Sequence, residues 1–69
     1  MDKTQLKKRL IFLRYKQNLT TEEVAKKIGL SPSAIRNYES GLRIPSIKNI
    51  EKLAKIYQCN PAYILGWIK

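Results

Sequence analysis

Histidine is absent from the 69-residue chain, and cysteine occurs only once, as Cys59. A single cysteine cannot form a disulfide within the chain, which agrees with a reducing cytoplasm, bacterial or that of a phage host. The cysteine and histidine spacings of zinc sites are missing, and most general-base and triad chemistry needs a histidine. We therefore expect no metal, no cofactor and no enzymatic activity.

Acidic residues and long apolar runs are also scarce. Lys and Arg total 14 against 5 Asp and Glu, which gives a formal net charge of +9. The longest apolar run near the N-terminus, residues 10–13, is too short for a signal peptide, and no segment approaches transmembrane length. The charge points to nucleic acid, an anionic membrane or an acidic protein as partner, and the length predicts one domain over residues 1–69.

Prolines, glycines and capping residues divide the first half of the chain into three predicted helices. The first runs over about residues 3–17, with Leu6, Leu10 and Leu13 at helical spacing. The sequence TTEE, starting at Thr20, forms a capping box for the second helix, which ends before a glycine at position 29. The third follows a Ser-Pro pair at 31–32 and ends near residues 40–41.

Two further helices are predicted in the second half. The fourth follows Pro45-Ser46, and its inward residues are expected to be Ile47, Ile50, Leu53, Ala54 and Tyr57. The pair Asn60-Pro61 opens a fifth over residues 62–69. The chain is therefore predicted to be all-α, a compact five-helix bundle with short loops.

The second and third helices form the most informative unit. Only Gly29, Leu30 and Ser31 separate them, and so short a turn forces a steep crossing, as in a helix-turn-helix over about residues 21–40. On a helical wheel the apolar residues of the third helix share one side, and its other side is polar, with Pro32, Ser33, Arg36, Asn37 and Ser40. Arginine can bridge guanine O6 and N7, and asparagine can bridge adenine N6 and N7, so this side is suited to reading bases.

The stretch LTTEEVAKKIGLSPSAIRNYESGLRIPS, with the motifs LTxxEVAxxIGLS, IxxYExG and PS, resembles the Cro/repressor-type (XRE-like) helix-turn-helix family of phage repressors and small bacterial regulators. The resemblance extends over about residues 6–65. It implies a lambda-repressor-like domain whose third helix enters the major groove of double-stranded DNA. The function it implies is a sequence-specific transcriptional regulator, such as a Cro-like repressor.

The resemblance also implies roles for individual residues. Proline stands at position 32, where many members read a base with glutamine, so base reading is assigned to Ser33, Arg36 and Asn37. Arg14 and Glu39 match a family ion pair between the first and third helices. Cys59 stands where the family has a buried apolar residue, so it is expected in the core. The expected backbone-contacting or supporting residues are Thr20, Thr21, Ser31, Pro32, Ser40, Arg43 and Lys48.

The C-terminal sequence YILGWIK has more apolar area than a closing helix needs. We expect Tyr63, Trp67 and Ile68 to form the contact of a symmetric homodimer that binds an inverted repeat, with Ile11 and Phe12 as secondary candidates. The alternative is that the tryptophan folds back over the core of its own chain. Because the chain ends just after the bundle, we expect control through its own concentration, without a small-molecule effector.

Two other functions fit parts of the sequence. The bundle could serve as a protein-interaction module, such as an antitoxin or anti-repressor. The basic first helix could lie on a membrane surface, although the four helices that follow make that function superfluous. The sequence leaves open the operator, the regulated genes and whether binding represses or activates.

Overall fold

A computed structural model describes residues 3–69, and in this range the chain forms five α-helices and no strand. This confirms the predicted all-α fold. The helices are α1 (Lys3–Lys16), α2 (Thr21–Ile28), α3 (Pro32–Ser40), α4 (Ile47–Tyr57) and α5 (Pro61–Ile64).

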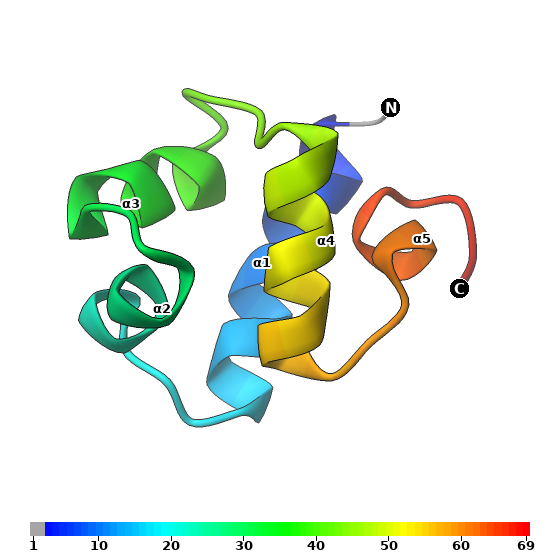
Figure 1. The fold of residues 1–69 in the computed structure, drawn as a ribbon. Helices are drawn as coiled ribbons and strands as arrows, with labels where there is room; N and C mark the ends of the chain where they lie inside the picture. Colours follow the sequence, from blue (N-terminus) through cyan, green and yellow to red (C-terminus); the bar gives the residue numbers. More distant parts are fainter. Residues whose placement is uncertain (1–2) are drawn as a thin grey trace.

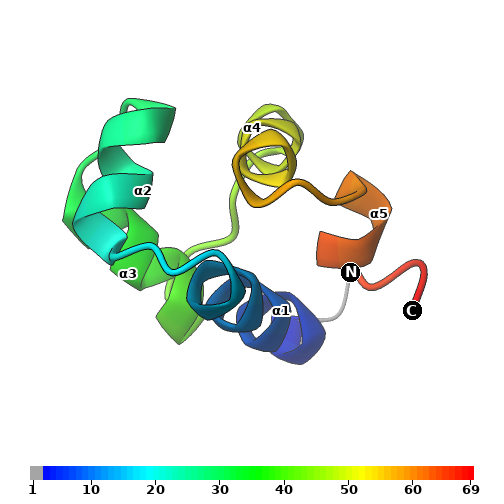
Figure 2. The same ribbon diagram turned by 90° about the horizontal axis from the view of Figure 1, so that it is seen from below.

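The helices are arranged around α1 and α4, which form the middle of the molecule. Figures 1 and 2 show α2 and α3 together on one side of this pair and α5 on the other side. Contacts join α2 to α3 and α4, α1 to α3 and α5, and α4 to α5. The α2–α3 pair is therefore held at the edge of the bundle, with α3 supported from behind by α1.

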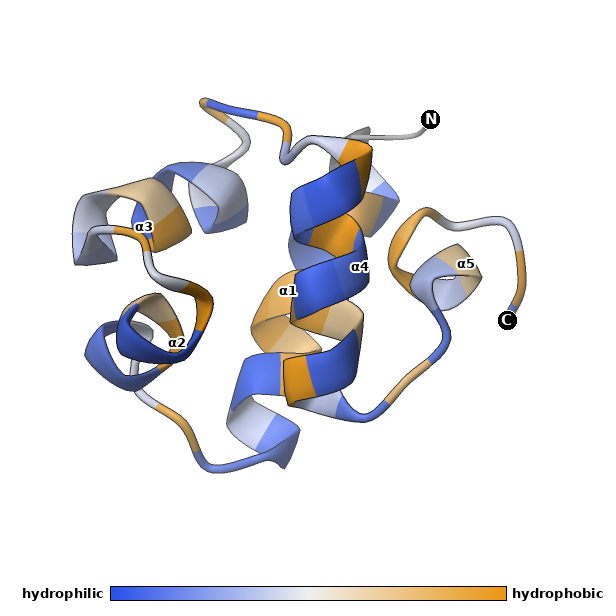
Figure 3. Cartoon of the chain, viewed as in Figure 1, coloured by the Kyte–Doolittle hydropathy of each residue, from blue (hydrophilic) through white to orange (hydrophobic). Residues whose placement is uncertain are grey.

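One apolar core joins all five helices. The hydropathy colouring in Figure 3 shows apolar residues on the inner sides of α1 and α4 and polar residues on the outer side of α4. The contributing residues are at most 8% exposed: Leu6, Leu10, Leu13, Val24, Ala25, Ile28, Ile35, Tyr38, Ile50, Leu53, Ala54, Tyr57, Ile64 and Leu65. Burial of these side chains is the main force that fixes the orientation of α3.

The ends of α2 follow directly from its sequence. The Thr20 hydroxyl accepts a hydrogen bond from the Glu23 backbone N–H at 3.1 Å, and the Glu23 carboxylate accepts one from the Thr20 N–H at 2.9 Å. At the other end Gly29 has φ +83°, a left-handed conformation that glycine adopts without steric cost. Both features match the predicted capping box and stop.

Two details differ from the sequence prediction. Ile47 is 56% exposed instead of inward, because α4 begins at this residue and its buried stripe starts one turn later at Ile50. The fifth helix ends at Ile64 instead of continuing to residue 69. Gly66 has φ +80° there, and hydrogen bonds from Gly66 N to Tyr63 O (3.1 Å) and from Trp67 N to Ala62 O (2.9 Å) close a Schellman-type helix end.

Candidate nucleic-acid interface

The turn between α2 and α3 fixes the angle at which the two helices cross. The backbone N–H groups of Gly29 and Leu30 both donate to the Ala25 carbonyl at 2.9 Å, and Ala25 itself is 2% exposed. Ser31 then caps α3, its hydroxyl accepting from the Ala34 N–H at 3.2 Å, and Pro32 occupies the first helical position. A small side chain, a left-handed glycine and an N-cap thus produce a tight turn.

The inner face of α3 is anchored to the bundle. Ile35 and Tyr38 are buried, and the Tyr38 hydroxyl accepts a hydrogen bond from the Asn49 side-chain amide of α4 at 3.2 Å. Only one face of α3 can therefore meet a partner.

An ion pair provides the second anchor of α3. Arg14 Nε lies 2.7 Å from Glu39 Oε2, and Arg14 Nη2 donates to Glu39 Oε1 at 3.0 Å. Arg14 Nη1 also donates to the Leu19 carbonyl at 3.1 Å, so the guanidinium ties the α1–α2 loop to α3. The hydrogen bonds to Glu39 raise the pKa of Arg14 above its ordinary value, so its guanidinium stays charged. The two side chains are 13% and 11% exposed.

The outer face of α3 carries the three predicted base-reading residues. Ser33 and Arg36 are exposed, and Asn37 is half-buried. Arg36 Nη1 lies 3.4 Å from Glu22 Oε2 of α2, and Arg36 Nη2 lies 3.5 Å from the Ser33 hydroxyl oxygen. These long, exposed contacts leave the guanidinium accessible, and the whole face is small and polar. A face of this size and chemistry can approach base edges in a groove.

The Helix-turn-helix family profile matches residues 6–64 of the chain. The chain belongs to this Cro/repressor-type helix-turn-helix family.

Three curated proteins are similar to this helix-turn-helix chain. YobD of Bacillus subtilis (strain 168), an uncharacterized HTH-type transcriptional regulator, is 38% identical over 58 residues, which cover 84% of this chain and 52% of that protein. RstR, the cryptic phage CTXphi transcriptional repressor of Vibrio cholerae, is 42% identical over 45 residues, covering 65% of this chain and 40% of RstR. MJ0272 of Methanocaldococcus jannaschii, another uncharacterized HTH-type transcriptional regulator, is 40% identical over 52 residues, which cover 75% of this chain and 79% of MJ0272.

The chain spans about half the length of YobD and less than half of RstR. No solved structure matches it.

The other residues of the helix-turn-helix that were assigned to the interface have structural bonds of their own. The hydroxyls of Thr20 and Ser31 cap α2 and α3, and that of Thr21 donates to Glu22 Oε1 at 3.1 Å. The Ser40 hydroxyl donates to the Asn37 carbonyl at 3.2 Å and accepts from the Leu42 N–H at 3.3 Å. They shape the helix ends that carry the reading face.

The two expected basic contacts flank the helix-turn-helix. Arg43 lies in the loop after α3 and Lys48 in the first turn of α4, and both are exposed. The Arg43 N–H donates to the Asn37 carbonyl at 3.1 Å, which fixes the loop against the end of α3. Sequence reasoning missed the pairing of Glu22 with Arg36, because it depends on how α2 and α3 cross and no local pattern indicates it.

The three residues expected at a dimer contact are in different environments. Trp67 is 70% exposed and Ile68 45% exposed, so the tryptophan does not fold back over its own core. Tyr63 is half-buried, with the Arg9 guanidinium 4.3 Å from its ring centroid. Arg9 also donates to the carbonyls of Tyr63 and Ile68, the latter at 2.6 Å. The main chain after α5 is thereby fastened to α1, and the tryptophan points into solvent.

No group of His, Cys, Asp and Glu side chains among residues 3–69 could hold a metal ion. No helix in this range has the length and apolar character of a membrane span. Cys59 is half-buried against the core, and burial raises the pKa of its thiol. Its packing is that of an apolar residue.

Proposed function

We propose that the protein binds double-stranded DNA sequence-specifically and regulates transcription. The observation that carries the proposal is the outer face of α3, where Ser33, Arg36 and Asn37 are accessible while Ile35 and Glu39 fasten the opposite side to the bundle. The net charge of +9 and the family membership support it. So do the names of the relatives, which are transcriptional regulators and a phage repressor.

The proposed mechanism separates affinity from choice of sequence. With α3 in the major groove, Arg36 would donate to guanine O6 and N7, Asn37 would pair with adenine, and Ser33 would bond either base. Arg43 and Lys48 would bind phosphates on either side of the groove, with Thr21 as a third donor. The phosphate contacts would supply much of the affinity and make it fall steeply with salt.

We further propose that residues 1–69 form one domain that acts as a homodimer through Trp67 and Ile68, with Tyr63 supporting them. A twofold dimer would present two copies of α3 about 34 Å apart, one turn of DNA, and would favour an inverted repeat. Bound at a promoter, it would act as a Cro-like repressor by excluding RNA polymerase. Its own concentration would set the occupancy, without a small-molecule effector.

A protein-interaction module, such as an antitoxin or anti-repressor, is the second candidate. The observation that favours it is exposed aromatic surface on α1, where Phe12 is 54% and Tyr15 66% exposed. Such side chains commonly anchor protein interfaces. These two side chains lie outside the helix-turn-helix. DNA binding therefore requires Arg36 and Arg43, whereas a protein interface on α1 does not.

Selection of binding sites from random duplex DNA tests the proposal. We expect a selected inverted repeat whose binding constant falls log-linearly with salt, by a slope of about −0.9 per phosphate contacted. Arg36→Ala should cost about 1–3 kcal/mol of discrimination at one base pair. Arg43→Ala should weaken all sequences alike and reduce the salt slope by about 1.

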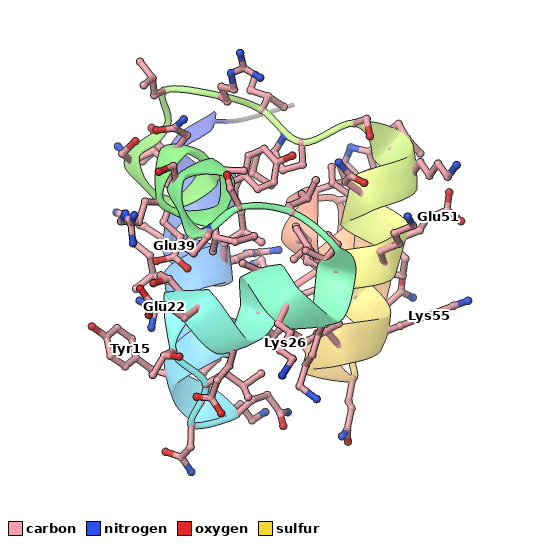
Figure 4. The ribbon with its side chains drawn as sticks, turned by 60° about the vertical axis from the view of Figure 1, so that its left-hand side comes forward. Tyr15, Glu22, Lys26, Glu39, Glu51 and Lys55 are labelled. Carbon is pink, nitrogen blue, oxygen red and sulfur yellow. The ribbon has the colours of Figure 1, made fainter. Side chains whose placement is uncertain are left out.

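Lys55→Ala is the matched control for loss of a positive charge. Figure 4 shows Lys55 on α4, pointing away from α3. This variant should keep the selected sequence and most of the affinity. Absence of a selected sequence, together with binding that Arg36→Ala and Arg43→Ala do not change, would favour the protein-interaction module instead.

A further inference from the structure

Glu22 is an acidic residue on a face proposed to meet DNA. Acidic side chains are scarce, and the other three on the described residues are accounted for: Glu23 completes the capping box of α2, Glu39 pairs with Arg14, and Glu51 lies on the exposed face of α4. Figure 4 shows Glu22 on the side of α2 that faces α3, and Glu51 at the opposite edge of the view. A carboxylate near phosphates weakens binding, so its presence needs a reason.

A line of polar contacts joins Glu22 to the reading face. The Thr21 hydroxyl donates to Glu22 Oε1 at 3.1 Å, Glu22 Oε2 lies 3.4 Å from Arg36 Nη1, and Arg36 Nη2 lies 3.5 Å from the Ser33 hydroxyl. Arg36 therefore has a polar neighbour on each side, one from α2 and one from the preceding turn of α3. A guanidinium has five N–H donors, so one N–H on each of these nitrogens stays available for a base.

Fold stability does not account for the Glu22–Arg36 pair. Its side chains are 65% and 55% exposed, and exposed pairs of this kind contribute little to folding. The Glu22 backbone N–H and the Thr21 hydroxyl hold the pKa of the Glu22 carboxyl below its usual range, so the carboxylate stays charged at neutral pH. A permanent negative charge thus sits beside the arginine proposed to read guanine.

We propose that Glu22 is a positioning residue that sets the DNA specificity of Arg36. Its carboxylate orients the Arg36 guanidinium for two parallel hydrogen bonds to one guanine, and its charge repels phosphates when that guanine is missing. Both effects raise the ratio of specific to non-specific binding, the first by favouring the correct site and the second by weakening all others. The inference rests on the proposed function and adds a residue outside α3 to the reading of bases.

The test compares Glu22→Gln with Glu51→Gln, which removes the same charge from α4. Dissociation constants are measured for the selected site, for that site with the Arg36 base pair changed, and for random duplex DNA. For Glu22→Gln we expect discrimination at that base pair to fall roughly fivefold, part of what a bidentate contact supplies, and random DNA to bind more tightly. Glu51→Gln should leave the discrimination unchanged.

Two further variants separate orientation from charge. Glu22→Asp keeps the charge but shortens the side chain, so it should lose discrimination while binding random DNA as weakly as the wild type. In an Arg36→Ala background, Glu22→Gln should no longer alter discrimination, because the residue to be oriented is gone. Thermal unfolding followed by circular dichroism checks that Glu22→Gln and Glu51→Gln have the same melting temperature.

The outcomes distinguish this inference from the proposed function. Equal discrimination in Glu22→Gln and Glu51→Gln, on a wild type that prefers a selected site, overturns the role of Glu22 and leaves DNA binding intact. An effect of Glu22→Gln on discrimination at that base pair that persists without Arg36 also overturns it. A wild type with no sequence preference overturns the proposed function, and the role of Glu22 with it.

Discussion

Arg14 of α1 and Glu39 of α3, 25 positions apart in the chain, form an ion pair with two hydrogen bonds, of 2.7 and 3.0 Å. A third hydrogen bond runs from Arg14 to the carbonyl of Leu19 at 3.1 Å. The guanidinium thus holds three segments at once: a central helix, the loop before α2 and the end of α3. A single mostly buried side chain thus adds a polar anchor to the apolar packing that orients α3.

Glu39→Gln should destabilise the protein, because it leaves the mostly buried Arg14 charge without its partner. We expect the free energy of unfolding to fall by about 2 kcal/mol and the melting temperature by about 10 °C. Calorimetry of Glu39→Gln beside the exposed-site control Glu51→Gln measures the difference. If Glu39→Gln leaves both the melting temperature and the DNA affinity unchanged, the pair has neither a structural nor an aiming role.

Replacing both partners separates those two roles. Arg14→Met with Glu39→Leu removes the charges together, so stability should recover relative to Glu39→Gln, since apolar replacements of buried pairs are often neutral. The orientation of α3 would then lack its hydrogen bonds. We expect the double variant to discriminate less between operator and random DNA than the wild type, as measured in parallel binding titrations.

Gly29→Ala should cost about 1 kcal/mol of folding free energy, entirely through the backbone. The residue has φ +83°, and a Cβ built there meets no atom within 4 Å, so no side chain has to move. Gly29→Asn is the matched variant, because asparagine tolerates this conformation, as Asn18 does at φ 57°. Urea unfolding should rank glycine above asparagine above alanine, and an alanine variant as stable as the wild type would contradict the explanation.

The sequence predicted those features that depend on neighbouring residues. The TTEE capping box, the glycine stop at 29 and the Ser-Pro helix start are decided within a few positions, so they could be recognised without a structure. The Arg14–Glu39 pair is not local, and it was expected only because the residues match a family pattern. Helix periodicity gave the core of α4 but not the exposure of Ile47, since periodicity does not show where neighbouring elements cease to cover a helix.

Two other features depend on the packed arrangement. The fifth helix was predicted through residue 69 from its apolar residues, whereas Gly66 ends it by a Schellman-type closure after Ile64. The pairing of Glu22 with Arg36 arises only when α2 and α3 cross at the angle set by the turn. In sequence the two residues are 14 positions apart and lie on different helices, so the periodicity of one helix does not relate them.

The protein should lose stability in alkali partly through Tyr57. Burial raises the pKa of its phenol above the usual value, and the nearby Glu39 carboxylate adds to the shift. Above about pH 10 the unfolded chain releases the phenol proton while the folded chain retains it, so the free energy of unfolding falls as pH rises. The stabilisation from the protonated Tyr57 phenol is fully present below the pKa that the phenol has in the unfolded chain. It is lost as the pH rises toward the higher pKa of the folded chain.

Tyr57→Phe removes that titration, so the free energy of unfolding of the variant should fall less steeply with pH. Above about pH 10 we expect its slope to differ from that of the wild type by about 1.4 kcal/mol per pH unit. Urea melts of wild type and variant over a pH series measure the two slopes. Tyr15→Phe, at a 66% exposed side chain, is the control and should follow the wild type. Parallel slopes for Tyr57→Phe and wild type would show that the phenol does not contribute.

Trp67→Ser should weaken self-association more than it weakens the fold. The side chain is 70% exposed, so the monomer loses little buried area, whereas a dimer through this end would lose its largest aromatic contact. Arg9 keeps the adjoining main chain in place through its hydrogen bonds to the carbonyls of Tyr63 and Ile68.

Leu42→Ser is the matched control, because Leu42 is 76% exposed but lies in the α3–α4 loop. Sedimentation at micromolar concentration should show a dimer for wild type and Leu42→Ser and mostly monomer for Trp67→Ser. A wild type that is monomeric both free and on DNA would remove the dimer from the mechanism, and each copy would then have to find its half-site independently.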